Sequence, residues 1–342
     1  MADLDPDDLS FLSDQGRKNV IEEMATSQLI AYSLRSPSTK TQVESIHHQL
    51  SSLEFHIDHT KVILKSEDAP DMEVRFVMFK GRDKKNVDDD RIPLPNPISI
   101  QSHAIINQEY QVTEMWKEPD YCSWEQWLCH LRDIFHCQNV KLFFKENGFS
   151  RFSVQSIQEL FNGFNIIGVG ADESSREDLV ELLETFKPTK DIRINYLDQD
   201  ILKLIPEDLD FLKFGKRIGL KAEELLELDS KFIEVLSSKI MEVGAQGFIK
   251  QWMKMTSNVN LEFLSLRYEK KTFPQNGEER IIAKIPRRVL SKEGKRFRAV
   301  VPESTWAYIS GAYELTRVDG KMATVVFEQE SDVRWIKFYA HK

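Results

Sequence analysis

Short apolar runs recur along residues 122–267, and each run is followed by a stretch with the spacing of an amphipathic helix. The runs begin near Asn139, Asn165, Asp191, Leu209, Ser230 and Leu261, with separations of 18 to 31 residues. Strands that alternate with helices usually form a parallel sheet covered by those helices. The pattern therefore predicts an α/β fold with one core in this part of the chain.

Several of these runs share the spacing x-x-apolar-x-apolar, and the clearest examples lie at residues 164–169, 209–214 and 261–266. The separations scatter around the period of roughly 20 to 29 residues that is typical of leucine-rich repeats. In a stacked solenoid the shared apolar positions point inward and the helices pack outside the strands. We favour such a curved, repeat-like sheet, and a generic α/β domain is the open alternative.

The regions on either side have different patterns, so the chain is α+β overall. Residues 9–50 have the helical spacing of three short helices, one of them starting at Pro37. Alternating apolar residues between 53 and 78 predict a small antiparallel sheet, and the charged, proline-rich residues 81–97 predict a loop. After Lys271 the chain ends in strands, where Asp319-Gly320 predicts a β-hairpin with positive φ at both central residues.

Composition limits the classes of function. Hydrophobic residues make up 41% and charged residues 30%, and the net charge is −9, so only a local basic patch could bind nucleic acid. The basic segment 287–298 is most simply a solvated loop, with a nuclear-import signal or a contact with an acidic partner as alternatives. No apolar run approaches the ~20 residues that span a bilayer, so we expect no membrane segment.

Three cysteines fall in one short stretch, Cys122, Cys129 and Cys137, and they are too few to staple a secreted fold. We therefore expect a reducing intracellular compartment, cytoplasmic or nuclear. With His130 and His136 these cysteines suggest a zinc site, but their spacing differs from the paired ligands of structural zinc sites. Residues 124–135 fit an amphipathic helix instead, so we expect buried structural cysteines. No catalytic set stands out, and we expect no metal or other cofactor.

The N-terminal helical region resembles an F-box of the divergent kind found in large nematode families. The resemblance rests on four short phrases in order, namely LSFLSD at 9–14, NVIEEM at 19–24, LIAYSLRS at 29–36 and TK at 39–40. Ser10 stands where many F-boxes have proline. The resemblance implies a small three-helix F-box over residues 5–50.

The rest of the chain is similar to the F-box-associated domain, type 2. Its phrases appear as WLCHLRDIF at 127–135, FIKQW at 248–252, NLEFLSL at 260–266, SGAY at 310–313 and RVDGKMAT at 317–324. The resemblance implies this domain over residues 121–342, for which the apolar spacing predicts a leucine-rich-repeat-like arrangement and Asp319-Gly320 a terminal β-hairpin. A β-rich connecting region then covers residues 51–120.

Together the two resemblances imply the substrate-recognition adaptor of a Skp/cullin/F-box ubiquitin ligase. The F-box would bind a Skp-family adaptor and through it a cullin, while the C-terminal domain would bind a protein target through residues that the sequence does not identify. Such an adaptor needs no active site of its own. The residues proposed to contact the Skp-family partner are apolar, and they are Leu9, Phe11, Leu12, Ile21, Met24, Leu29, Ile30 and Leu34.

A module of about 40 residues buries little surface alone, so some of these apolar residues should meet a partner. Docking of the helices on the chain's own second domain is the alternative. A scaffold with a degenerate F-box that joins no ligase is a rival function, suggested by Ser10. A zinc-dependent enzyme built on the five Cys and His residues of 122–137 is a further rival.

Overall fold

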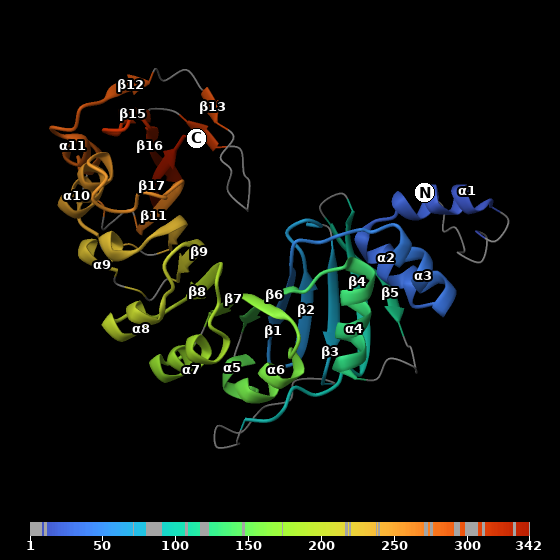
Figure 1. Ribbon diagram of the computed structural model, residues 1–342. Coiled ribbons are helices and arrows are strands. Elements are labelled where there is room, and N and C mark those ends of the chain that lie inside the picture. The colour runs from blue at the N-terminus through green and yellow to red at the C-terminus, as the bar shows by residue number, and fades with distance from the viewer. Residues whose placement is uncertain are drawn as a thin grey trace. The chain divides into compact units, whose positions relative to one another are not determined.

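The computed structural model describes residues 9, 12–70, 72–79, 91–106, 109–116, 123–145, 148–172, 174–215, 218, 220–236, 238, 240–269, 273, 276–290, 295–297, 307–309, 312–330 and 333–341. The chain divides into two compact units, Met1–Ile167 and Gly168–Lys342, and each is described by itself (Figure 1). Across the described residues, eleven helices accompany sheets of mixed strand direction, so the predicted α/β class is confirmed. None of the helices in this described part is both long and apolar enough to cross a membrane.

Three short helices open the first unit, namely α1 (Asp14–Glu22), α2 (Thr26–Ser33) and α3 (Pro37–Ser45). Ser13 Oγ accepts a hydrogen bond from the N–H of Gly16 at the start of α1, and Ser36 Oγ accepts one from Thr39 at the start of α3. Such caps satisfy N–H groups that have no partner within the helix. Pro37 takes the first position of α3, where its missing N–H costs nothing. Local sequence therefore fixes where two of these helices begin.

The first unit also contains a mixed sheet with the strand order β6-β1-β2-β3-β4-β5. The strands are β1 (Leu53–Ile57), β2 (Lys61–Lys65), β3 (Glu73–Val77), β4 (Ser99–Ile106), β5 (Glu109–Trp116) and β6 (Asn139–Phe144). Strands β1 to β5 pair antiparallel in chain order, which confirms the predicted small sheet of β1 to β3 and adds β4 and β5 to it. Strand β6 pairs parallel to β1, with Leu53 beside Val140.

Helix α4 (Trp124–Phe135) packs on one face of this sheet, and it is followed by the short helices α5 (Gly148–Arg151) and α6 (Val154–Leu160). The ring of Phe76 on β3 lies 5.0 Å from Trp124 and 5.2 Å from Trp127, measured between ring centroids. Both indole side chains are buried. The predicted amphipathic helix over 124–135 is thus confirmed, and it closes the core of the first unit.

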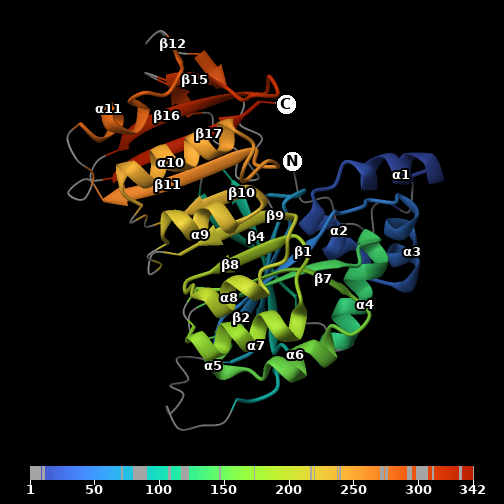
Figure 2. The same ribbon diagram turned by 60° about the vertical axis from the view of Figure 1, so that its left-hand side comes forward.

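The second unit is built on strands that alternate with helices. The elements are β7 (Asn165–Ala171), α7 (Arg176–Phe186), β8 (Asp191–Ile194), α8 (Gln199–Leu204), β9 (Leu209–Phe214), α9 (Ala222–Glu227), β10 (Ser230–Val235), α10 (Glu242–Met253) and β11 (Phe263–Glu269). Neighbouring strands of this series pair in parallel from β7 to β11. These strands begin at or within two residues of the predicted positions. Figure 2 shows α7 to α10 on one side of the strands.

After β11 the sheet continues with antiparallel strands in the order β17-β16-β15-β12. The remaining elements are α11 (Gly277–Ile282), β12 (Arg288–Leu290), β15 (Ala312–Thr316), β16 (Met322–Glu330), β17 (Val333–Ala340) and a two-stranded sheet of β13 (Lys295–Phe297) and β14 (Ala307–Ile309). The predicted hairpin at Asp319-Gly320 joins β15 to β16. Only Gly320, with a φ of 89°, has a positive φ there, so the prediction that both central residues need one was wrong. Asp319 instead uses its carboxylate to bind Arg317 and the N–H of Lys321.

The register of the parallel strands separates two faces of the second unit's sheet. Val169, Ile192, Leu212, Ile233 and Leu264 are register neighbours and are all buried. The next strand continues this row with Phe338, whose ring contacts Phe248 and Trp252 of α10. This face is therefore the one that the helices cover. Side chains one residue before or after each of these positions point to the opposite face.

Gly148 is expected to tolerate no side chain. A Cβ at this position would lie 2.2 Å from the carbonyl oxygen of Ile57 and 3.3 Å from Cα of Asp58, and backbone cannot move aside cheaply. We expect Gly148→Ala to lower the free energy of unfolding by about 2 kcal/mol, as overpacking commonly does. Gly247→Ala is the control, because nothing lies within 4 Å of its Cβ and alanine favours a helix by about 1 kcal/mol. Urea denaturation of both variants measures the difference, and equal stabilities would contradict the expected clash.

Candidate functional site

The structure describes seven of the eight proposed Skp-contact residues and buries four of them. Four are buried, with exposed fractions of 4% or less, namely Leu9, Ile21, Leu29 and Ile30. Three are partly exposed, namely Leu12, Met24 and Leu34. Phe11 lies outside the described residues. Among the proposed contact residues that the structure describes, the apolar surface accessible to a partner therefore comes from these three side chains.

The N-terminal helices dock on α4 through polar contacts. Ser33 Oγ on α2 lies 2.8 Å from Nε2 of His130, and both residues are buried. Lys40 Nζ on α3 donates a hydrogen bond of 2.7 Å to Asp133, which also forms an ion pair with it. The sequence left two alternatives for what packs against these helices, a Skp-family partner or the chain's own second domain. Helix α4 belongs to residues 121–342, the region predicted to be the C-terminal domain. The chain thus covers part of its own helical module.

Burial of His130 has an electrostatic consequence. Desolvation, with a smaller contribution from the positive charge of Lys40, lowers the pKa of His130 from 6.5 to about 4, although Asp133 opposes the shift. The imidazole is therefore neutral at physiological pH. A neutral ring can exchange one hydrogen bond with Ser33 without placing a charge in the α2–α4 contact. Hydrogen-bonded packing is the role that the structure gives to this histidine.

The other members of the suggested zinc set are placed apart from one another or are engaged elsewhere. Cys122 lies outside the described residues, Cys129 is exposed and Cys137 is buried with its thiol 3.4 Å from the carbonyl oxygen of Asn139. His136 Nε2 lies 3.0 Å from the carbonyl oxygen of Glu44. Among the described residues, these side chains form no group of three potential ligands. The expectation of buried cysteines is confirmed for Cys137 and is wrong for Cys129, which sits on the solvent side of α4.

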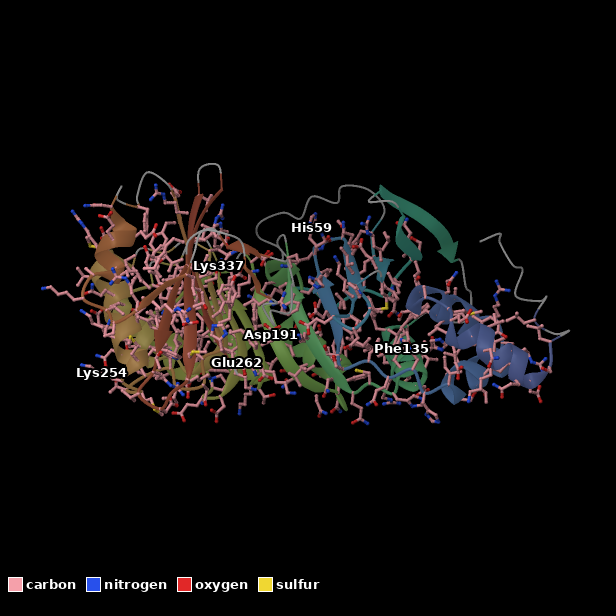
Figure 3. The ribbon with its side chains drawn as sticks, turned by 90° about the horizontal axis from the view of Figure 1, so that it is seen from above. His59, Phe135, Asp191, Lys254, Glu262 and Lys337 are labelled. Atoms are coloured by element: carbon pink, nitrogen blue, oxygen red, sulfur yellow. The ribbon has the colours of Figure 1, made fainter. Side chains whose placement is uncertain are left out.

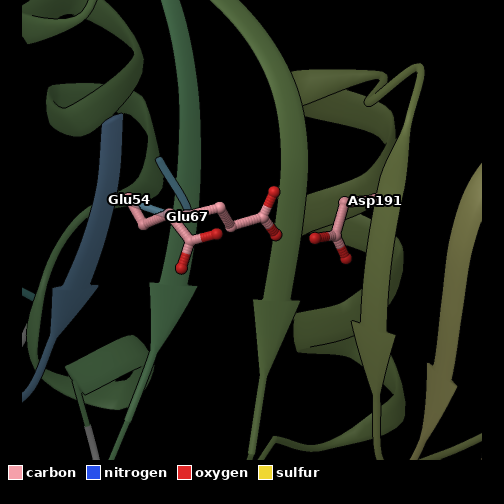
Figure 4. Close-up of side chains that lie close together, drawn as sticks. All are labelled: Glu54, Glu67 and Asp191. Atoms are coloured by element: carbon pink, nitrogen blue, oxygen red, sulfur yellow. The ribbon is translucent and has the colours of Figure 1, made fainter. Parts of the chain in front are cut away.

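The face of the first unit's sheet opposite α4 carries a compact charge cluster. Lys141 Nζ on β6 lies 3.3 Å from Glu54 on β1 and 2.7 Å from Glu67, which follows β2. Figure 4 shows Glu54 and Glu67. Two carboxylates share one ammonium group here, and Lys141 and Glu54 are both buried. Buried charges persist only when they are paired, so this cluster is best explained as sheet packing.

The uncovered face of the second unit's sheet combines aromatic and charged side chains. We call one line of cross-strand neighbours the aromatic row, and its members are Phe211, Phe232, Phe263 and Tyr339. The adjacent line, called the charged row, consists of Arg193, Lys213, Glu234 and Lys337, with Ser265 between the last two. All of these alternate along their strands with the buried row. No described helix of the second unit lies on this side (Figures 1 and 2).

The charged row is held by short ion pairs. Lys213 Nζ lies 2.7 Å from Glu234, and Lys337 Nζ lies 2.6 Å from Glu328 of the neighbouring strand β16. Arg193 lies 3.0 Å from Asp191 on its own strand, and Figure 3 labels Asp191 and Lys337 on β8 and β17. This face of the sheet thus carries charges in fixed positions beside the rings. Partly exposed aromatic side chains and charges in defined positions are typical of protein-recognition surfaces.

The two rows were not assigned from sequence, although a signal for them exists. Phe211 and Lys213 flank the buried Leu212, and Phe232 and Glu234 flank the buried Ile233 in the same way. A period of two within each strand places these flanking residues on one face. The register between strands was needed to bring them into line.

A small pocket of about 270 Å³ lies where α8 meets the starts of β9 and β10. Its lining includes the apolar residues Leu202, Ile205 and Leu209 and the acidic residues Glu207 and Asp229. Small-molecule sites usually range from ≈300 to 1,000 Å³ and converge on a few polar groups. The pocket has room for a single side chain of a partner at most.

The basic segment 287–298 is described only in part, and there Arg287 donates hydrogen bonds to the carbonyl oxygens of Ile282 and Ile285.

Residues 200–266 match a family model described as F-box associated. The match begins in α8 and ends in β11, so it supports an F-box-associated domain within the second unit. It includes Phe211, Lys213, Phe232 and Glu234 of the two rows. Searches of curated proteins and of solved structures find no match to the chain.

Proposed function

We propose that this protein is the substrate-recognition adaptor of a Skp/cullin/F-box ubiquitin ligase. The single observation that carries the proposal is the match of residues 200–266 to an F-box-associated family. Three short helices precede this region in the chain, at the place where the sequence resembles a nematode-type F-box. In the proposal, residues 5–50 form the F-box, residues 51–120 connect, and residues 121–342 form a leucine-rich-repeat-like domain.

The mechanism requires recognition by this chain and catalysis by other subunits. The F-box would bind a Skp-family adaptor and through it a cullin, while the C-terminal domain would hold a protein target. Tethering raises the effective concentration of the target near a ubiquitin-charged enzyme, and this alone can increase the rate of transfer. In this role the protein is not itself an enzyme, and it works in the cytoplasm, the nucleus or both.

The partner contact would use the partly exposed side chains of the helical module. Leu12, Met24 and Leu34 are apolar and accessible, whereas Ile21 and Leu29 are buried. Glutamate at a buried position would place an unpaired charge in the core and unfold the module, so such variants do not test binding. Glutamate at the accessible positions adds charge to the surface and leaves the core intact.

We expect the double variant Met24→Glu, Leu34→Glu to bind a Skp-family adaptor at least about tenfold more weakly than the wild type, equivalent to ~1.4 kcal/mol. Isothermal titration calorimetry with the full chain measures both affinities, and circular dichroism verifies the fold. The matched control is Ser38→Glu, Gln49→Glu, which adds the same charge at two exposed polar positions. Its affinity is expected to equal that of the wild type.

Two other outcomes would redirect the proposal. If the folded wild type binds no Skp-family adaptor, the alternative of a scaffold with a degenerate F-box takes its place. If elemental analysis of the purified protein finds stoichiometric zinc, the enzyme alternative built on Cys129, His130, His136 and Cys137 returns, with Cys122 as the remaining ligand.

A further inference from the structure

We infer that the aromatic and charged rows of the second unit bind an extended protein segment that carries aromatic and acidic side chains. The inference rests on the proposed function, because it names the class of target that the F-box-associated domain would recognise. The site is the part of the sheet formed by Phe211 and Lys213 on β9 and Phe232 and Glu234 on β10, with Arg193 on β8 beside it.

The aromatic row provides the apolar part of the contact. Phe211 and Phe232 are cross-strand neighbours, and both are partly exposed although they lie in the middle of a sheet. The row continues through the buried Phe263 to Tyr339, whose rings are 5.1 Å apart. Aromatic side chains at the centre of an interface commonly contribute most of the binding energy. A partner's aromatic or aliphatic side chain would bury the accessible edges of these rings.

The charged row provides the complementary charge. Arg193 and Lys213 lie directly opposite one another on adjacent strands, and like charges in such positions repel. A partner carboxylate between them would offset this repulsion while each cation keeps its own carboxylate partner. The guanidinium of Arg193 also lies 5.3 Å from the centre of the Phe211 ring, which places positive charge beside the apolar contact. The geometry favours an acidic side chain next to an aromatic one.

The net charge of the whole chain also favours this face as the place where an acidic partner binds. The charged row and its ion-pair partners Asp191 and Glu328 supply three cations and three carboxylates, so these side chains are neutral together, whereas the chain as a whole has a net charge of −9. An acidic segment is therefore repelled by most of the surface and least by this face. Single-stranded RNA also combines rings with negative charge, but it needs several uncompensated cations along its backbone. The ion pairs of the charged row favour a peptide.

Four labelled probes test the inference on the full chain by fluorescence anisotropy. They are a peptide of alternating Glu and Phe, the same peptide with Lys in place of Glu, a peptide of alternating Glu and Ser, and an oligouridylate of similar length. We expect the Glu/Phe peptide to bind at least about tenfold more tightly than the others, a difference of ~1.4 kcal/mol. Equal binding of the Lys/Phe peptide, tighter binding of the oligouridylate, or no binding of the Glu/Phe peptide would each overturn the inference.

Variants then locate the site. Lys213→Gln and Phe232→Ser are each expected to weaken Glu/Phe peptide binding at least about fivefold, or ~1 kcal/mol. The matched controls Lys203→Gln on α8 and Val243→Ser on α10 change highly exposed side chains on the helical side and are expected to bind as the wild type does. Lys213→Gln replaces one polar side chain by another and changes no ring, so it remains informative if Phe232→Ser proves unstable. Unchanged binding by the folded Lys213→Gln variant would refute the assigned site. No Skp-family protein is used, so failure here leaves the adaptor test unaffected.

Discussion

Replacing Trp127 by alanine is expected to lower the free energy of unfolding of the first unit by about 4 kcal/mol. The indole is fully buried on α4, 5.2 Å from Phe76 on the sheet and 6.1 Å from His130, measured between ring centroids. The indole therefore lies between β3 and the ring of His130, which contacts Ser33 of α2. Loss of a side chain of this size leaves a cavity that a sheet and a helix cannot close by small movements.

Trp335→Ala is the matched control for this prediction. Trp335 on β17 is partly exposed, and its ring lies near the cationic groups of Arg267 and Lys337. We expect its loss to cost about 1 kcal/mol, because cation–π contacts and partial burial each contribute little at an accessible site. Urea denaturation followed by circular dichroism, together with hydrogen exchange to assign each unit, measures both variants. A cost below 1 kcal/mol for Trp127→Ala would show that α4 is not a central part of the core.

Acidification is expected to destabilise the contact between α2 and α4 through His130. Burial lowers the pKa of this imidazole from 6.5 to about 4 in the folded protein. Between these two pH values the unfolded chain binds a proton that the folded chain does not, so stability falls as the pH is lowered. The difference corresponds to about 3 kcal/mol lost between pH 6.5 and pH 4, with no further loss below the folded-state pKa.

The variant His130→Asn isolates this contribution from the titration of carboxylates in the same range. Asparagine keeps a polar side chain near Ser33 and has no proton to gain. The difference in unfolding free energy between wild type and variant is therefore expected to narrow as the pH falls from 6.5 to 4. Chemical denaturation at several pH values measures it, and NMR titration of His130 gives the pKa directly. A pKa near 6.5 in the folded protein would contradict the prediction.

The sequence predicted where the helices and strands of this fold lie along the chain better than it predicted which of them are in contact. Ser36 and Pro37 mark the start of α3, and apolar spacing located β7 to β10 at their observed first residues. Such signals are local, since caps and periodicity depend on residues within one or two turns. Strands β4 and β5 were missed because their sequences, such as SIQSHAII, interrupt apolar alternation with polar residues.

The contact between α2 and α4 and the pairing within the aromatic row had no such local signal. His130 was considered as a metal ligand, whereas its partner is Ser33, 97 residues earlier in the chain. The sequence also left open which of the N-terminal apolar residues would be buried, and the structure buries Leu29 and Ile30. The aromatic row needed the register of four strands before its members could be recognised as neighbours. Pairing across a chain is decided by the whole fold, so residue patterns within one element do not specify it.

The docking of the N-terminal helices on α4 has a consequence for synthesis of the protein. Lys40 and Asp133 are 93 residues apart, so the ribosome completes α1 to α3 well before their cover exists. At ~5 to 20 residues per second this interval is roughly 5 to 20 s. During that time the apolar faces of the three helices are exposed on a nascent chain, where chaperones or an early-binding partner could capture them. Assembly with a partner during translation, before the first unit closes, would then compete directly with folding.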